Sequence, residues 1–165
     1  MRRTKSRVAI DRVGIYARIG DVPEVHRLSR YQPTYQDRDV WTEFCEEYEY
    51  GRGSGRRYNE AVDRAGSHWL EHMGDLQRHH ALATPTHVER WCRRLLDTKS
   101  PATAYNYWVR VKRFYDWLLW HTDHPHRYSP VMLAVIAGGA TGAIWDVKIE
   151  KWDTVRPRHK EEDSA

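Results

Sequence analysis

The sequence predicts an all-α fold, a four-helix bundle with irregular extensions at both ends. Three segments begin with a hydroxyl residue followed by proline, at Thr84, Ser100 and Ser129. A Ser or Thr side chain accepts a bond from an orphan backbone N–H at a helix start, and a proline placed next needs no partner for its own nitrogen. Apolar residues then recur every three or four positions, as on one face of a helix. No segment has a convincing strand pattern, which favours a bundle.

The first two predicted units precede the bundle. Residues 1–36 have no sustained apolar period and are interrupted by Gly and Pro, so we expect an arm with little structure of its own. Residues 37–58 are the second unit. Helical spacing of apolar residues over 39–50 predicts a short acidic helix, and the basic, Gly-rich turn at 51–55 ends it.

Residues 59–142 form the predicted bundle. Its helices are expected over about 59–77, 85–97, 101–120 and 131–137, with short connections between them. The apolar residues assigned to the core of the first three are Ala61, Val62, Ala65, Trp69, Leu70, Met73, Leu76, Val88, Trp91, Cys92, Leu95, Leu96, Ala104, Trp108, Val111, Phe114, Tyr115 and Leu118.

The last predicted unit is a C-terminal segment and polar tail at 143–165. Residues 143–152 fit either a short helix or an extended arm, because their apolar residues match neither period decisively. Residues 156–165 are polar and are expected to be disordered.

The helix over 101–120 has one aromatic and aliphatic face and one polar, cationic face. Guanidinium, amide and hydroxyl groups together suit phosphates and the base edges of a major groove. The solvated face of an ordinary amphipathic helix has the same composition, so the pattern leaves both interpretations open. The polar face holds Thr103, Asn106, Arg110, Arg113, Trp117 and Trp120, with Tyr107 and Lys112 between the two faces.

The charge of the chain is unevenly distributed around a net value of +4. Residues 37–50 hold six acids and one Arg, whereas residues 52–130 hold thirteen Lys or Arg, eight acids and eight of the ten histidines. This distribution favours an anionic partner. Histidines that charge near pH 6 would add to the basic surface, so affinity for DNA is expected to rise as the pH falls.

Several classes of protein are disfavoured by the sequence. Cys45 and Cys92 stand 47 residues apart without partners at metal-finger spacing, so we expect two buried thiols and neither a disulfide framework nor a zinc ribbon. No apolar run approaches the roughly 20 residues of a membrane span, and no apolar segment follows the basic N-terminus as in a secretory signal. We therefore expect a cytoplasmic protein with no membrane partner and no cofactor.

Two histidine groups suggest metal sites as rival interpretations. His68-Trp-Leu-Glu-His72 has the form of an inverted zinc peptidase motif, with Glu150 as a distant third ligand. The same helix needs its apolar residues for a core, and the chain is far shorter than that enzyme class, so the motif is disfavoured. In the loop His121–His126, satisfied or solvated histidines are favoured, and a metal there stays an open alternative.

A series of motifs in the bundle resembles a known family. Thr84-Pro-x-His-Val-x-x-Trp is followed by Leu95-Leu, Ser100-Pro-x-Thr-x-x-x-Tyr, Arg113-Phe-Tyr-x-Trp-Leu, and then His124-Pro to Ser129-Pro-Val. Over residues 59–137 this order resembles the SAM-like core-binding domain of tyrosine recombinases of the phage-integrase type. The family more often has Asn-Pro where this chain has Ser129-Pro.

The resemblance implies a bundle that clamps one side of duplex DNA through contacts with the backbone and the major groove. It implies that residues starting and lining the 101–120 helix face DNA, and that residues just before the first bundle helix reach phosphates. The polar face of this helix adds the amide of Asn106 and the guanidinium of Arg113 to this set. The predicted DNA-binding residues are Arg56, Arg57, Tyr58, Lys99, Ser100, Thr103, Asn106, Tyr107, Arg110 and Arg113.

The chain departs from the family where catalysis is concerned. The family's catalytic domain carries two Arg, a Lys, a His-x-x-Arg box and a nucleophilic Tyr, and only 28 residues follow Ala137. The His-x-x-Arg strings at His87 and His124 lie inside the presumed binding domain and are interpreted as chance. We therefore expect no catalytic residues and no strand cleavage. Two interpretations of the chain stay open: a stand-alone DNA-binding relative of the family, or a severed front half of a recombinase.

The resulting expectation is a duplex DNA clamp or accessory factor in recombination or integration. Its expected partner is double-stranded DNA, together with a catalytic recombinase subunit or a second copy of the chain. The alternative is a helical protein-interaction module or transcriptional regulator that uses an exposed aromatic patch at Trp117 and Trp120. Rings of this kind also suit single-strand binding, in which bases stack on aromatic side chains.

Overall fold

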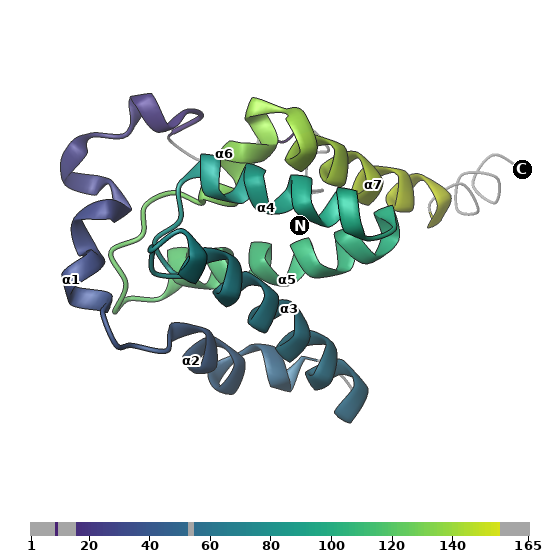
Figure 1. The fold of residues 1–165 in the computed structure, drawn as a ribbon, viewed down its shortest axis with the longest axis horizontal. Coiled ribbons are helices and arrows are strands. Elements are labelled where there is room, and N and C mark those ends of the chain that lie inside the picture. Colours follow the sequence, from purple (N-terminus) through teal and green to yellow (C-terminus); the bar gives the residue numbers. More distant parts are fainter. Residues whose placement is uncertain (1–8, 10–15, 53–54, 156–165) are drawn as a thin grey trace, which may run out of the picture.

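The structure is a computed structural model that describes residues 9, 16–52 and 55–155, with side chains up to residue 150. Seven α-helices and several short 3-10 turns make up this part of the chain, which contains no strand (Figure 1). The predicted all-α class is therefore confirmed.

The four helices predicted for the bundle are present as α3 (Arg56–Asp75), α4 (Pro85–Thr98), α5 (Pro101–Trp120) and α6 (Pro130–Ala137). The bounds of α4, α5 and α6 agree closely with the predicted ones, whereas α3 begins three residues early, so that Arg56, Arg57 and Tyr58 form its first turn instead of preceding it. Helix α5 packs against α3, while α4 packs against α6 (Figure 1).

Hydroxyl caps start three of these helices, as predicted. Thr84, Ser100 and Ser129 each accept a bond from the backbone N–H three residues further on, at 3.2, 3.2 and 3.4 Å. At α4 the His87 side chain completes a capping box, because its Nδ1 accepts a bond from Thr84 N at 3.0 Å. Each cap stabilises its helix by about 1 kcal/mol.

The segment before α2 differs from the unstructured arm that was predicted. It forms the 3-10 turns η2 (Ile19–Asp21), η3 (Glu24–His26) and η4 (Leu28–Tyr31) and the short helix α1 (Gln32–Tyr35). This segment covers one end of the bundle, at the left of Figure 1. Residues 1–8 and 10–15 of the predicted arm lie outside the described residues.

Long-range contacts hold this segment in place. The side chains of Leu28 and Tyr35 are each 1 % exposed. Leu28 N donates to the hydroxyl of Tyr128 at 3.1 Å, and the Tyr35 hydroxyl is hydrogen-bonded to His124 Nδ1 at 2.6 Å. These partners lie about a hundred residues further along the chain, so no local pattern in residues 1–36 reveals them.

The predicted short acidic helix is confirmed as α2 (Val40–Glu47). Asp39 caps it by accepting a bond from Thr42 N at 3.0 Å. A histidine supplies a second cap, because Nε2 of His80 accepts bonds from the N–H groups of Val40 and Trp41, both at 3.2 Å. The 3-10 turn η5 (Glu49–Gly51) follows, and residues 53–54 of the Gly-rich turn lie outside the described part.

The C-terminal segment is a long helix, α7 (Gly139–Val155), which packs against α4, α5 and α6. The alternatives of a helix and an extended arm are thereby resolved, and the predicted boundary at residue 142 falls inside this helix. Glu89 of α4 caps it, because the carboxylate accepts bonds from Ala140 N at 3.0 Å and Thr141 N at 2.8 Å. The tail 156–165 lies outside the described residues.

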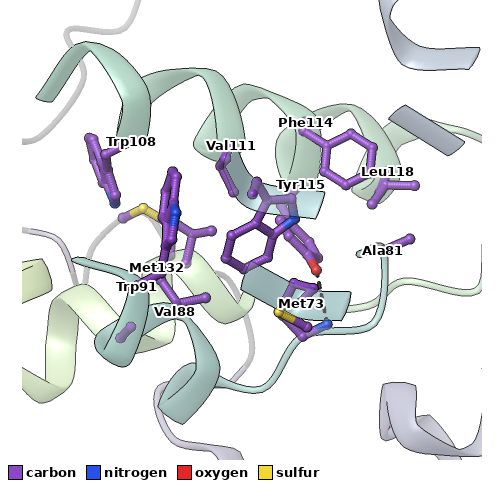
Figure 2. Close-up of a cluster of buried hydrophobic side chains, with 14 of the residues drawn as sticks. Met73, Ala81, Val88, Trp91, Trp108, Val111, Phe114, Tyr115, Leu118 and Met132 are labelled. Carbon is purple, nitrogen blue, oxygen red and sulfur yellow. Dashed lines mark hydrogen bonds between the residues drawn. The ribbon is translucent and has the colours of Figure 1, made fainter. Parts of the chain in front are cut away.

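The core is built from the predicted apolar face of α5, whose side chains point towards those of α4 and α6 (Figure 2). Trp69, Trp91 and Trp108 are fully buried, which confirms their predicted place in the core. Burial of each large apolar side chain contributes roughly 1.5–3 kcal/mol. Cys45 and Cys92 are free and buried, as predicted, and burial raises the pKa of each thiol to about 12.

No single helix in the described part of the chain is long and apolar enough to cross a membrane. Helices α6 and α7 meet that test of length and composition only when they are taken together, and they meet at a 95° bend.

Candidate nucleic-acid interface

The predicted DNA-binding residues separate into an exposed group and an internal group. Side chains of the exposed group lie at the start of α3 and the start of α5, in or next to solvent. The internal group gathers around the buried carboxylate of Glu49, which the sequence did not single out. The exposed group is Arg56, Arg57, Lys99, Ser100, Thr103, Asn106 and Tyr107, and the internal group is Tyr58, Arg110 and Arg113.

Glu49 of η5 is completely buried and is the centre of the internal group. Its Oε1 accepts bonds from Arg113 Nη1 at 3.2 Å and from the hydroxyl of Tyr58. Arg110 Nη1 lies 3.7 Å from the same oxygen, and its guanidinium carbon lies 4.6 Å from the centre of the Tyr58 ring. The two guanidinium groups therefore face a carboxylate of the protein itself.

This arrangement gives Arg110 and Arg113 a structural role. A buried carboxylate without cationic partners costs several kcal/mol, and the two arginines offset that cost. Their side chains are only 15 % and 31 % exposed. Burial, followed by the hydrogen bond to Glu49, raises the pKa of Tyr58, so this hydroxyl keeps its proton and continues to donate it.

The connection between α4 and α5 carries a cation held over an aromatic ring. Lys99 Nζ lies 4.8 Å from the centre of the Tyr107 ring. Tyr107 in turn meets the ring of His68 edge-on at 5.5 Å, and His68 Nδ1 accepts a bond from Trp91 Nε1 at 2.8 Å. The half-buried Lys99 and Tyr107 are thus positioned by contacts that reach back to the core.

Three polar side chains at the start of α5 are exposed. Ser100 caps the helix, and its hydroxyl also donates to Thr103 Oγ1 at 3.0 Å. Asn106 lies one turn further along the same side of the helix. These groups combine hydroxyl and amide chemistry on one side of α5, as the sequence predicted.

Further arginines extend this surface. Arg64 is exposed on α3, seven residues after Arg57 and four before His68, so the three share a face of the helix. Neither Arg57 nor Arg64 pairs with another described residue, whereas Arg56 is bound to Glu60 at 2.9 Å.

Helix α4 adds three exposed arginines, which line a surface pocket of about 340 Å³ between α3 and α4. Arg94 donates to His72 Nδ1 at 3.2 Å, one turn of α3 beyond His68. The carboxylates of Asp75 and Asp97 line the same pocket and reduce its positive charge. The three arginines are Arg90, Arg93 and Arg94.

We call one set of these residues the basic face. It joins the cations of α3, α4 and the α4–α5 turn to the polar start of α5. The sequence analysis did not select Arg64 and Arg94, because an exposed charge at helical spacing looks the same on a binding face as on a solvated one. The basic face consists of Arg57, Arg64, Arg94, Lys99, Ser100, Thr103 and Asn106.

The prediction that histidines add positive charge near pH 6 is wrong for most of them. Burial lowers the pKa of His80 to about 3 and the pKa values of His124 and His126 to about 4. Burial also lowers the pKa values of His68, His72, His79 and His87. These rings are neutral hydrogen-bonding and packing groups.

The histidines of the rival metal motifs have structural partners. His72 Nε2 donates to the backbone oxygen of His87 at 3.0 Å, and His68 accepts a bond from Trp91. Within the described residues, including the His121–His126 loop, no three His, Cys, Asp or Glu side chains are placed to hold a metal ion.

The aromatic patch of the alternative interpretation is only partly exposed. The Trp120 side chain is 86 % exposed at the end of α5. Trp117 is half-buried, with its ring centre 5.6 Å from that of Phe44 and 4.9 Å from that of His121.

Searches of protein-family models, curated proteins and solved structures found no match to this chain.

Proposed function

We propose that this protein binds duplex DNA through the basic face, as a clamp or accessory factor in recombination or integration, without cleaving strands itself. The observation that carries the proposal is the exposure of Arg57 and Arg64 on the face of α3 that includes His68, whose ring meets that of Tyr107 on α5. Lys99 lies over the same Tyr107 ring, at the start of the helix that exposes Ser100, Thr103 and Asn106. Lys and Arg neutralise phosphates, while hydroxyl and amide groups bond to phosphates and base edges.

The resemblance to the core-binding domain of tyrosine recombinases supports this proposal. Helices α3 to α6 occur in the order that the resemblance implies, with proline-marked starts at α4, α5 and α6. In the proposal the bundle is of the SAM-like type and acts on cytoplasmic DNA. Its partner is a catalytic recombinase subunit or a second copy of the chain.

The proposal assigns different roles within the predicted set. Arg57, Arg64 and Lys99 contact phosphates, since their charges are not matched by an acidic partner among the described residues. Thr103 and Asn106 reach towards base edges. Arg110 and Arg113 act as positioning residues, because their guanidinium groups hold η5 against α5 through Glu49.

The test is a titration of labelled mixed-sequence duplex DNA at 50 and 200 mM salt. Affinity should fall steeply with salt, and the double variant Arg57→Ala/Arg64→Ala should reduce the slope of log K against log salt by about 2, since each phosphate contact contributes about 0.9. Arg30→Ala/Arg127→Ala is the matched control, because both arginines are exposed and lie outside the basic face. No binding at 50 mM salt would overturn the proposal.

A protein-interaction module or transcriptional regulator is the second candidate, favoured by the exposure of Trp120. An exposed indole of this size is typical of an interface residue. If this candidate is right, Trp120→Ala abolishes association with the partner while the basic-face variant leaves it unchanged.

A further inference from the structure

A groove of about 580 Å³ runs along one side of α5. Its walls come from the segment after α2, from α5 and from α7. The volume is within the range of roughly 300–1,000 Å³ that is usual for small-ligand sites. The lining residues that matter here are Tyr48, Arg52, Lys112, Arg113, Trp117 and Trp120.

The groove is positively charged. Arg52, Lys112, Arg113 and Lys148 line it, and Asp116 is the one carboxylate among its lining residues in the described part of the chain. Lys112 Nζ is bound to Asp116 at 2.6 Å, whereas Arg52 is bonded to the Tyr48 hydroxyl and has no carboxylate partner among the described residues. A ligand that fills the groove is therefore favoured if it is anionic.

The remaining cations are held in place by the protein. Arg52 donates to the hydroxyl of Tyr48, and its guanidinium carbon lies 5.1 Å from the centre of that ring. Arg113 shares Glu49 with Arg110, so one buried carboxylate faces two guanidinium groups. The cluster behind the groove thus keeps an excess of positive charge.

Aromatic rings lie beside these cations. Trp117 is four residues, or one turn of α5, beyond Arg113, and Tyr48 lies beside Arg52. The Trp117 ring is fixed from behind by Phe44 and Phe114, with ring centres 5.6 and 6.5 Å away. Trp120 extends this series into solvent, since its side chain is 86 % exposed.

We propose that this groove binds a short stretch of single-stranded nucleic acid, with bases stacked on Trp120 and Trp117 and a phosphate at Arg52. Planar bases and phosphates alternate along a single strand, as rings and cations alternate in the groove. Base stacking on aromatic side chains together with a basic track is the general mode of single-strand binding. The inference does not rest on the proposed duplex binding, because its stacking residues lie outside the basic face.

The test uses a fluorescently labelled single-stranded dT12 at low salt, with anisotropy as the readout. Wild-type protein should bind it, and Trp120→Ala and Arg52→Ala should each weaken binding about tenfold, as expected for a lost stacking or phosphate contact. Trp120→Phe should retain most of the affinity, because a ring remains. Both residues are exposed, so thermal melts of the variants should match that of the wild type.

Two further arms separate this inference from the proposed function. Arg57→Ala/Arg64→Ala should weaken duplex binding and leave dT12 binding unchanged, while Trp120→Ala should have the reverse effect. Absence of dT12 binding, or binding insensitive to Trp120→Ala, overturns the inference whatever the duplex result. A labelled poly-glutamate peptide that binds as tightly as dT12 and is equally sensitive to Trp120→Ala also overturns it, in favour of an acidic protein partner.

Discussion

Arg113 Nη1 lies 3.2 Å from Oε1 of Glu49, a carboxylate that is completely buried and 64 residues earlier in the chain. This pair fixes η5 to the middle of α5. Because of this pair, the Arg113 guanidinium points towards a buried carboxylate, although helical periodicity places Arg113 on the polar face of α5.

Replacing Glu49 with Gln should lower the free energy of unfolding by about 3 kcal/mol, because breaking a buried ion pair leaves uncompensated charge. Urea unfolding measures the loss. Arg113→Ala should cost less, since Glu49 keeps the Tyr58 hydroxyl and Arg110 as partners. A Glu49→Gln variant as stable as the wild type would show that the buried pair contributes nothing.

Arg110 and Arg57 should respond differently to truncation. Arg110→Ala removes a partner of Glu49 and should reduce both the melting temperature and duplex affinity. Arg57→Ala removes an exposed charge and should reduce duplex affinity alone. Parallel melts and DNA titrations of the two variants check this difference, and equal melting temperatures would contradict the positioning role of Arg110.

Acidification should destabilise the fold. The folded-state pKa of His80 is about 3, and those of His124 and His126 are about 4, all below the ordinary value of 6.5. At pH values between the folded-state pKa and 6.5, the unfolded chain binds more protons than the folded chain. The stability that these neutral histidines contribute is therefore fully present above about pH 6.5 and is lost as the pH falls towards 4. Each such histidine contributes a slope of about 1.4 kcal/mol per pH unit in that window.

Urea unfolding at pH 7, 6, 5 and 4 measures this loss, and His80→Gln should reduce the slope. A flat profile from pH 7 to 4 would contradict the assignment of neutral, buried rings. For the same reason, these histidines should not make duplex affinity rise between pH 8 and 5.5.

Two glycines of α3 should respond in opposite ways to alanine. At Gly66 an added Cβ would lie 2.1 Å from Trp41 Nε1, so the indole must move and the variant should lose about 1–3 kcal/mol. At Gly74 nothing lies within 4 Å of the added Cβ, and Gly74→Ala should gain about 0.5–1 kcal/mol from helix propensity. Urea unfolding of both variants measures the contrast, and a neutral Gly66→Ala would show that the Trp41 contact is readily relieved.

Local signals account for the parts of the fold that the sequence could predict. The starts of α4, α5 and α6 were predictable because each cap involves residues only three positions apart. The segment from η2 to α1 was not, because its anchors Tyr128 and His124 lie far along the chain. The same holds for α7, whose start is fixed by Glu89, about fifty residues earlier.

The candidate site was predictable to a similar extent. Helical spacing placed Thr103 and Asn106 on the exposed side of α5, where they lie. It could not show that Arg110 and Arg113 turn towards Glu49, since that partner belongs to an acidic segment distant in sequence. Periodicity gives the direction of a side chain from its helix, whereas a partner at long range decides whether its charge stays available.

The Tyr115 hydroxyl, fully buried in the core, has a consequence for the basic face. It accepts a bond from Ala83 N and donates to His80 O, both at 2.9 Å, and so ties α5 to the connection between α3 and α4. His126 reinforces the same connection by donating from Nε2 to Ala81 O at 2.6 Å. The spacing between the helices that carry the arginines of α3 and α4 is therefore preorganised, and little backbone entropy is lost when an anionic ligand meets them.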